Sequence, residues 1–341
     1  MIANVLVLGV GAAGVGEQII KSLKLQNIHD IKIIGSDINP NSYGRASVDK
    51  FYEVPVATSN NYLKVLEDII EENNINFIFP GSDPDMMFLS KNRSHFHKKN
   101  VGLGINSDEV INLCKNKFLT YEALSELDIH IPKYKRILTQ EDINDIDFFP
   151  LILKPNTGSG GSAGVNIAFD KRETELYVEL MLNQGIDIIA QSYEGNKESE
   201  FTIGVSASEK GKILGSICLK RDLTSSISLY KKFSKDSTDY VISSGISQGW
   251  ICHEDNLQSQ AEKIAECINS RGPLNVQGRE VDGKLLLMEI NPRLSGTSYM
   301  RALAGYNEPI SMLENFLLGS DFDFSYQDMY IGRTIMEKVL D

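Results

Sequence analysis

The chain has 341 residues, of which 42% are hydrophobic and 23% charged, and its formal net charge at pH 7 is −12. This length predicts a globular protein with two or three domains. The acidic balance argues against nucleic acid as a main partner, because phosphate backbones bind to concentrated basic surfaces, but a few lysines and a metal ion could still hold a nucleotide.

Neither an export signal nor a membrane span is indicated. Residues 1–9 lack the basic region and cleavage site of a signal peptide, and no apolar run approaches the roughly 20 residues that a membrane helix needs. The cysteines form no C-x-x-C pair, so the sequence suggests neither a zinc ribbon nor a redox motif. We therefore expect a cytoplasmic protein with reduced thiols and no membrane partner.

Residues 1–105 alternate between strand and helix patterns. Short apolar runs predict buried strands over Val5–Leu8, Ile31–Gly35 and Phe77–Pro80. The segments between them have helical spacing, over Glu17–Leu25 and Tyr62–Asn73. This alternation predicts a Rossmann-like domain, in which helices cover both faces of a parallel sheet.

A glycine loop joins the first predicted strand to the first predicted helix. Gly9-x-Gly11-x-x-Gly14 is followed by Asp37 after the second strand, which is the spacing of a dinucleotide-binding fingerprint. The alternative is a tight strand-to-helix turn that binds no dinucleotide. We favour the turn, because a stronger phosphate site follows, and keep an NAD-dependent oxidoreductase as a competing hypothesis.

A second glycine loop follows residues 106–150, which are mixed and include a predicted helix over Lys115–Leu127. Lys154 ends a strand and precedes Pro155–Gly164, a loop of glycines and small hydroxyls. Glycines let backbone N–H groups converge on phosphate oxygens, and Lys154 adds a compact positive charge. The loop lacks the G-K-[ST] of a Walker loop, and the alternative is a mobile surface hairpin.

Asn275–Glu280 and Leu285–Ile290 flank Asp282-Gly283 and predict a β-hairpin. On its second strand, Glu289 and Asn291 are two residues apart and therefore point to one face. Polar groups on an otherwise apolar strand need a partner, and carboxylate and amide oxygens are ligands that Mg²⁺ prefers.

Gln277 joins this face only if the pairing of the two strands allows it. A two-residue turn would place Gln277 on the opposite face from Glu289, whereas a three-residue turn over 282–284, or a bulge, would bring them together. We predict the three-residue turn. Arg293 continues the face, and its guanidinium suits a transferring phosphoryl group or an acyl phosphate. The alternative is a structural hairpin with a hydrogen-bonded end.

In this order the motifs are similar to those of a known superfamily. They are Lys117, Lys154 with its loop, Gln191-x-x-x-Gly195, Glu200-Phe-Thr, Asn-Val-Gln277 and Glu289-Ile-Asn-Pro-Arg293. Over about residues 1–320 the chain resembles the ATP-grasp superfamily, most closely the half-repeats of the carbamoyl-phosphate synthase large subunit and stand-alone carboxylate–amine ligases. The resemblance implies an α/β fold: a Rossmann-like pre-ATP-grasp domain (1–105), a two-lobed α+β ATP-grasp domain (106–320, small lobe about 120–195) and a tail (321–341).

The resemblance also implies which residues surround ATP. They are Lys117, Lys154, Ser159, Gly160, Gly161, Ser162, Gln191, Ser192 and Tyr193. For the acid that binds ribose, Glu198 and Glu200 both remain candidates. We prefer Glu200, because Phe201, Ile203 and Val205 then keep the register of a strand.

By the same resemblance, Gln277, Glu289 and Asn291 hold Mg²⁺, with Mn²⁺ as an alternative ion, and Arg293 and Lys154 are the catalytic residues. The chain departs from the synthase in being one unit without a glutaminase or allosteric domain, which speaks against carbamoyl phosphate as the product. The implied activity is an ATP-dependent, ADP-forming ligase that joins a small-molecule carboxylate to an amine through an acyl phosphate. A non-catalytic nucleotide-binding protein is another alternative. Dimers are common among similar enzymes, so a homodimer is one assembly that the resemblance allows.

Overall fold

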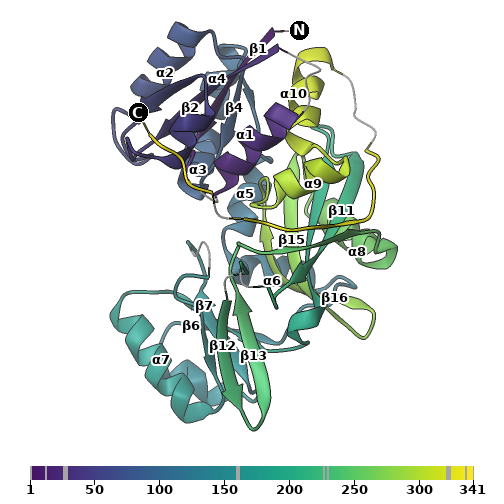
Figure 1. Ribbon diagram of the computed structural model, residues 1–341. Coiled ribbons are helices and arrows are strands. Elements are labelled where there is room, and N and C mark those ends of the chain that lie inside the picture. Colours follow the sequence, from purple (N-terminus) through teal and green to yellow (C-terminus); the bar gives the residue numbers. More distant parts are fainter. Residues whose placement is uncertain are drawn as a thin grey trace.

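The structure, a computed structural model, describes residues 2–11, 14–25, 30–158, 162–225, 227–228, 230–319, 324–334 and 336–340. Figure 1 shows an N-terminal domain and a small lobe at opposite ends of the molecule, with a large lobe between them. None of the helices in the described ranges is both long enough and apolar enough to cross a membrane.

The N-terminal domain is built on a parallel sheet with strand order β3-β2-β1-β4-β5. Its strands are β1 Ile2–Leu8, β2 Asp30–Asp37, β3 Lys50–Glu53, β4 Phe77–Pro80 and β5 Gly102–Leu103. Its helices are α1 Val15–Leu25, α2 Tyr62–Asn73, α3 Asp83–Lys91 and α4 Arg93–Lys98. Because the strands are buried on both faces, they carry continuous apolar runs, as the sequence predicted.

Each face of this sheet has its own hydrophobic core. Helices α2, α3 and α4 cover one face, with Leu66, Leu89 and Phe96 fully buried. Helix α1 covers the other face together with α10 (Glu308–Leu318), whose Ile310 and Leu313 join the same core. A late segment of the chain therefore attaches the N-terminal domain to the large lobe.

The small lobe is an antiparallel sheet with strand order β6-β9-β7-β8, covered by one helix. Its elements are β6 Tyr134–Ile137, β7 Leu151–Pro155, β8 Asn166–Ala168, α7 Lys171–Asn183 and β9 Ile188–Ser192. Two short helices, α5 Asp108–Cys114 and α6 Lys117–Ser125, lead into it. The helix predicted over Lys115–Leu127 corresponds to α6, whose start is fixed by Asn116, because its side chain accepts a hydrogen bond from the backbone N–H of Leu119 as an N-cap.

The large lobe is a six-stranded sheet with strand order β16-β15-β10-β11-β14-β17. Its strands are β10 Glu200–Ala207, β11 Ile213–Asp222, β14 Gln248–Cys252, β15 Pro273–Val281, β16 Lys284–Asn291 and β17 Met329–Ile331. Helix α8 (Asp255–Cys267) covers one face, and α9 (Ser298–Ala304) packs on the other. A separate hairpin, β12 Tyr230–Lys235 and β13 Thr238–Ser243, lies beside the small lobe (Figure 1), where Ile242 packs against Val165 and Ile167.

The mixed architecture, with a parallel N-terminal sheet and antiparallel sheets in two lobes, confirms the predicted fold class. The segment after β17 returns to the N-terminal domain, where the Lys338 ammonium lies 2.5 Å from the Ser47 hydroxyl and 4.9 Å from the centre of the Tyr43 ring.

Candidate active site

One face of the large sheet carries a row of polar side chains. Strand pairing places Thr202 opposite Gln277 and Gln277 opposite Glu289, while Asn275 lies opposite Asn291. The alternate residues of these strands, among them Ile203, Val276 and Ile290, enter the core under α8. The period of two along a strand therefore separates a polar face from an apolar one, as the sequence predicted.

The three-residue turn that we predicted for this hairpin is wrong. Val281 pairs with Lys284, so Asp282 and Gly283 form a two-residue turn, with φ angles of 51° and 75° that suit an Asp-Gly type I′ turn. Instead, a β-bulge adds one unpaired residue to the second strand, because Gln277 pairs with Glu289 but Gly278 pairs with Leu287. The extra residue is Met288. This bulge, the alternative route to alignment, brings Gln277 and Glu289 to one face.

The carbonyl oxygen of the bulged Met288 accepts a hydrogen bond from Lys154. The Lys154 Nζ atom lies 3.0 Å from this oxygen and 2.5 Å from Oε1 of Gln191, and the Tyr121 hydroxyl completes the cluster at 3.4 Å. Burial lowers the pKa of Lys154 to about 7, and repulsion from Lys117 acts in the same direction, whereas Glu289 opposes the shift. The structure therefore holds a titratable ammonium group among neutral oxygens.

Lys117 is the second buried lysine of this region. Its ammonium forms an ion pair of 3.1 Å with Glu289, and only 8% of the lysine side chain is exposed. Asn156, just after Lys154, fixes the start of α6: its carbonyl accepts from the Lys117 N–H and its side-chain oxygen from the Phe118 N–H. The β7 strand and the α6 helix are thus locked together at the two lysines.

These groups line one cavity between the small lobe and the large sheet. Its lining includes Lys117, Lys154, Ser162, Gln191, Ser192, Tyr193, Gln277 and Glu289, all of them predicted site residues. The cavity encloses about 90 Å³, and Val241, Ile242 and Ser243 of β13 line it as well. Five separate parts of the chain therefore converge on one site.

The β12–β13 hairpin is fastened over this cavity by Tyr193. The Tyr193 hydroxyl accepts from the Val241 N–H at 2.9 Å, and its ring meets the Tyr240 ring edge-on at 5.2 Å between centroids. On its other side the ring carries the Arg279 guanidinium, 4.5 Å from its centroid. Ser162 adds a hydrogen bond of 2.5 Å to the Ser243 carbonyl. Ser159, Gly160 and Gly161, which we predicted to cover the phosphates, lie outside the described residues.

Glu200 begins β10, in the register that we predicted, but its carboxylate is buried between two arginines. Arg221, at 2.7 Å, and the Ser243 hydroxyl both donate to Oε1 of Glu200, and Arg279 lies 3.4 Å from Oε2. Glu198 is 62% exposed. Among the described lining residues of the cavity, the acid that directly follows Gln191, Ser192 and Tyr193 is Glu194. Which acid binds ribose stays a prediction.

Gln277, Glu289 and Asn291 form a donor set that fits a hard cation. Their side chains are partly exposed, and in the described part of the chain the amide groups of Gln277 and Asn291 have no protein hydrogen-bond partner. Glu289 supplies the only carboxylate of the three and is oriented by Lys117. One carboxylate and two amide oxygens suit a Mg²⁺ that shares its remaining positions with phosphates and water.

Arg293 lies beyond the ligand strand, where the large lobe meets the N-terminal domain. Its Nε donates to Asp83 at 2.6 Å, and its Nη1 donates to the Leu294 carbonyl at 3.1 Å. Asp83 begins α3, directly after the β4 strand of the parallel sheet. The predicted catalytic arginine therefore sits at an interdomain junction and not in the wall of the 90 Å³ cavity.

Glycines beside the described part of the first glycine loop are closely packed. A Cβ atom on Gly16 would lie 2.4 Å from the Gly9 carbonyl oxygen, and one on Gly81 would lie 2.3 Å from that of Leu8. The Asp37 carboxylate accepts hydrogen bonds from its own loop, from the Asn39 N–H at 3.0 Å and the Ser42 hydroxyl at 3.2 Å. These contacts favour packing of the two loops over a dinucleotide site.

Sequence reasoning missed Tyr121, Arg279 and Ser243. Arg279 follows Gln277 by two residues on the same strand, so period-two counting could have placed it on the polar face. Tyr121 follows Lys117 by one helical turn, which is a weaker signal. Ser243 reaches the site only through the fold of the β12–β13 hairpin.

Two family models match parts of the chain. One described as "PylC-like, N-terminal domain" matches residues 5–103, and one described as "ATP-grasp in the biosynthetic pathway with Ter operon" matches residues 242–331. The carbamoyl phosphate synthase large chain of Clostridium botulinum (strain Eklund 17B / Type B) is 26% identical over 86% of this chain and 27% of its own length. The multifunctional protein ura1 of Schizosaccharomyces pombe is 21% identical over 97% of this chain and 14% of its own length. The chain thus spans about a quarter or less of these relatives.

Solved structures share the fold at low identity. L-amino acid ligase from Bacillus licheniformis matches with a TM-score of 0.66 and 16% identity, over 93% of this chain and 74% of that one. D-alanine–D-alanine ligase from Bacillus anthracis complexed with ATP matches with a TM-score of 0.58 and 15% identity, over 93% and 97%. The biotin carboxylase domain of Hydrogenobacter thermophilus 2-oxoglutarate carboxylase, in complex with MgADP, matches with a TM-score of 0.65 and 17% identity, over 95% and 71%. The matched domains and the carbamoyl phosphate synthase homologues confirm the predicted resemblance to ATP-grasp enzymes, and the chain shares its fold with these solved structures.

Proposed function

We propose that the chain is an ATP-dependent ligase that phosphorylates a carboxylate and joins the resulting acyl group to an amine, releasing ADP and phosphate. The observation that carries this proposal is the convergence of Lys117, Lys154, Gln277 and Glu289 on one cavity. Two cationic side chains beside carboxylate and amide oxygens are the groups that a triphosphate and its Mg²⁺ require. A bound triphosphate would favour the protonated form of Lys154.

The phosphoryl transfer needs charge stabilisation more than it needs a covalent nucleophile. When bound, Mg²⁺, or Mn²⁺ in its place, would neutralise phosphate oxygens beside Glu289. Lys117 and Lys154 hold the nucleotide phosphates, and Arg293 stabilises the transferring group. The carboxylate oxygen forms the new bond to phosphorus as ADP leaves, and the amine nitrogen then displaces phosphate from the acyl carbon.

The acceptor side of the site would lie at the junction marked by Arg293 and Asp83. There the end of the ligand strand meets the C-terminal end of β4, the edge of a parallel sheet where α/β proteins commonly bind ligands. Ser295 and Thr297 follow Arg293 with buried hydroxyls. We assign this junction to the carboxylate and amine substrates.

The cavity must open before ATP can enter. At about 90 Å³ it is smaller than the roughly 300–1,000 Å³ of ordinary small-molecule sites. The β12–β13 hairpin closes it through Tyr193 and Ser162, so the simplest opening moves this hairpin away from the small lobe. Closure over bound substrates would keep water from an acyl phosphate.

The test is an ADP-release assay over a panel of carboxylic acids and amines with Mg-ATP. Glu289→Gln and Lys154→Met should each abolish ADP release that depends on both substrates. The matched controls are Glu266→Gln on α8 and Lys284→Met at the hairpin turn, which change exposed residues of the same types. Both controls should keep full activity.

Binding measurements separate the alternatives. If the protein binds Mg-ATP in equilibrium dialysis but releases no ADP with any pair of substrates, it is a nucleotide-binding protein and the ligase proposal fails. Failure to bind Mg-ATP would remove the nucleotide site itself. Saturable NADH binding, detected by energy transfer from Trp250, would revive the oxidoreductase hypothesis.

A further inference from the structure

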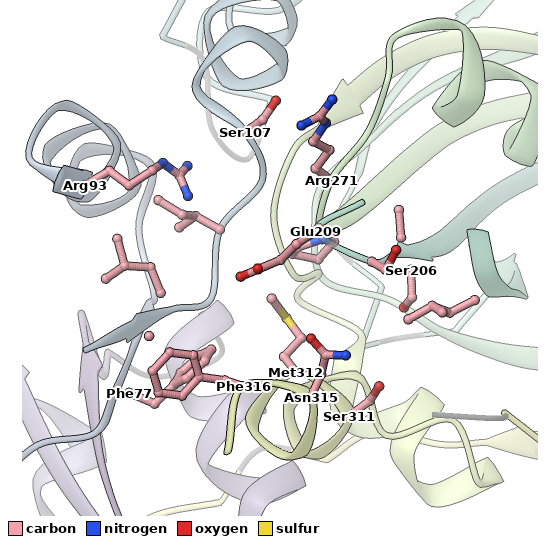
Figure 2. Close-up of a pocket in the computed structure, with 18 of the residues that line it drawn as sticks. Phe77, Arg93, Ser107, Ser206, Glu209, Arg271, Ser311, Met312, Asn315 and Phe316 are labelled. Carbon is pink, nitrogen blue, oxygen red and sulfur yellow. The ribbon is translucent and has the colours of Figure 1, made fainter. Parts of the chain in front are cut away.

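A second cavity lies between the N-terminal domain and the large lobe. It encloses about 370 Å³, within the range of small-molecule binding sites. Its walls come from β4, β5, the start of α5, the end of β10 and α10 (Figure 2). In the described chain it shares no lining residue with the 90 Å³ cavity at Lys154.

The second cavity is also separated from the metal-ligand row. It opens at Ser206 and Pro273, which pair with each other at one end of β10 and β15. Gln277 lies four residues further along β15, or about 13 Å at the rise of an extended strand. A ligand in this cavity would therefore not touch the proposed catalytic groups.

The floor of the cavity is partly apolar, with Asn315 and Ser311 of α10 beside the apolar side chains. Figure 2 shows Phe77, Met312 and Phe316 together at its base, and the two phenylalanine rings meet edge-on at 5.5 Å between centroids. Gly102 makes room for them, since a Cβ atom there would lie 2.4 Å from the Phe77 ring and 2.8 Å from that of Phe316. This floor suits an aliphatic or aromatic group.

The upper walls carry one ion-paired arginine, Arg93, and three exposed charged residues without an ion pair in the described part of the chain, Glu109, Glu209 and Arg271. Arg93 is already satisfied, because its Nε donates to Asp108 at 2.8 Å and its Nη2 donates to the Asn106 carbonyl. By contrast, the Arg271 guanidinium and the Glu209 carboxylate form no ion pair or side-chain hydrogen bond in the described part of the chain, either with each other or with other groups. Figure 2 shows both on the large-lobe side, with the Glu209 carboxylate extending into the cavity.

The backbone holds both of these charged residues in place. The Arg271 N–H donates to the Asn106 side chain at 2.8 Å, which ties the arginine to the domain junction. Glu209 lies in the turn between β10 and β11, closed by a hydrogen bond of 2.8 Å from the Ser208 N–H to the Lys212 carbonyl. The two charges are therefore presented on fixed segments, at a separation that prevents them from neutralising each other.

We propose that this cavity binds a free α-amino acid with an apolar side chain. The α-carboxylate pairs with Arg271, the α-ammonium pairs with Glu209, and the side chain packs on Phe77, Met312 and Phe316. Arg271 and Glu209 are exposed and solvated in the free protein, so an amino acid gains two charge-assisted contacts here, whereas a ligand with one charge gains only one. Because the ligand contacts both the N-terminal domain and the large lobe, its binding sets how firmly the two are held together. This proposal does not depend on the ligase activity.

Isothermal titration with L-leucine and L-phenylalanine, without nucleotide, tests the site. At least one should bind saturably, and Arg271→Ala and Glu209→Gln should each weaken binding about tenfold or more, because each removes a charge-assisted contact. Arg172→Ala and Glu179→Gln, which alter exposed residues on α7, are the matched controls and should leave binding unchanged. Arg293→Ala should also bind the amino acid normally, which separates this cavity from the proposed substrate junction at Arg293 and Asp83.

Two analogues of leucine test the assigned charges. 4-Methylpentanoate lacks the ammonium group and 3-methylbutylamine lacks the carboxylate, so each should bind about tenfold or more weakly than leucine. The proposal is overturned if no apolar amino acid binds, if binding survives both Arg271→Ala and Glu209→Gln, or if 4-methylpentanoate binds as well as leucine. Loss of binding in Arg293→Ala would move the ligand to the proposed substrate junction and would also overturn the proposal.

Discussion

Lys154 should make the stability of the ligand-free protein depend on pH in a way that a single substitution removes. An ordinary lysine has a pKa of 10.5, whereas burial lowers the pKa of Lys154 to about 7. Between these two values the unfolded chain holds a proton that the folded protein has released, so the free energy of unfolding rises with pH. The full shift corresponds to about 5 kcal/mol at about 1.4 kcal/mol for each pH unit.

Lys154→Met keeps a similar length of side chain without the charge and therefore removes this dependence. We expect the free energy of unfolding of the wild type, minus that of Lys154→Met, to rise by about 3 kcal/mol between pH 7 and pH 9.5. The assay is urea unfolding across this range, with EDTA present and nucleotide absent. Taking the difference removes the contributions of all other titrating groups.

Lys284→Met provides the control, since Lys284 is exposed at the hairpin turn and should give a difference that does not change with pH. The reasoning is refuted if the difference for Lys154→Met is also constant from pH 7 to pH 9.5. That result would mean that Lys154 titrates like a lysine in water, and that the cavity around it is far better hydrated than its closed geometry indicates.

Three further perturbations test other parts of the structure. Glu200→Gln leaves two buried guanidinium groups without their carboxylate and should lower the free energy of unfolding by about 3–5 kcal/mol. Glu198→Gln, at an exposed site, should change it by less than about 0.5 kcal/mol. Both are measured by urea unfolding, and equal effects of the two variants would contradict the buried network. Gly16→Ala places a Cβ atom 2.4 Å from a backbone oxygen and should lower the free energy of unfolding by about 1–3 kcal/mol in urea unfolding. An unchanged urea midpoint would contradict the close approach of the two loops. Tyr193→Phe removes the acceptor of the Val241 N–H and should speed hydrogen exchange of that amide, so an unaltered rate would mean that the hydroxyl does not hold the hairpin.

The N-terminal domain was the most predictable part of the fold. Its strands are buried on both faces, so runs such as Val5–Leu8 and Phe77–Pro80 have no polar interruptions. The same simplicity made the first glycine loop ambiguous, because a tight turn and a dinucleotide site require the same small residues. The close contacts around Gly16 and Gly81 favour the turn.

The polar face of the β15–β16 hairpin could be predicted, but not the way in which it is aligned. Asp282-Gly283 adopts the two-residue turn that this dipeptide favours, and a bulge at Met288 shifts the register by one residue so that Gln277 faces Glu289. Nothing in the side chain of a methionine marks a bulge. Its position is decided by what the freed carbonyl can bind, namely Lys154 on another sheet, and such a contact cannot be deduced from local sequence.

The β12–β13 hairpin was not predicted at all. Its strands carry Lys231, Lys232 and Lys235 in place of an alternating apolar pattern, because the hairpin packs on the small lobe mainly through Val241 and Ile242. Likewise, the sequence offered Glu198 and Glu200 as candidates for the ribose-binding acid, with a preference for Glu200. Only the pairing of β10 with β11 and β15 shows that Glu200 lies between Arg221 and Arg279.

The bulge at Met288 also makes the two lobes mechanically interdependent. The Met288 peptide unit aligns Gln277 with Glu289, and its carbonyl accepts a hydrogen bond from Lys154, which belongs to the small lobe. Any swing of the small lobe large enough to stretch this contact would pull on the strand that carries the acidic ligand. Opening of the small lobe for a nucleotide would then also shift the cation-binding face, because a single carbonyl group connects the two.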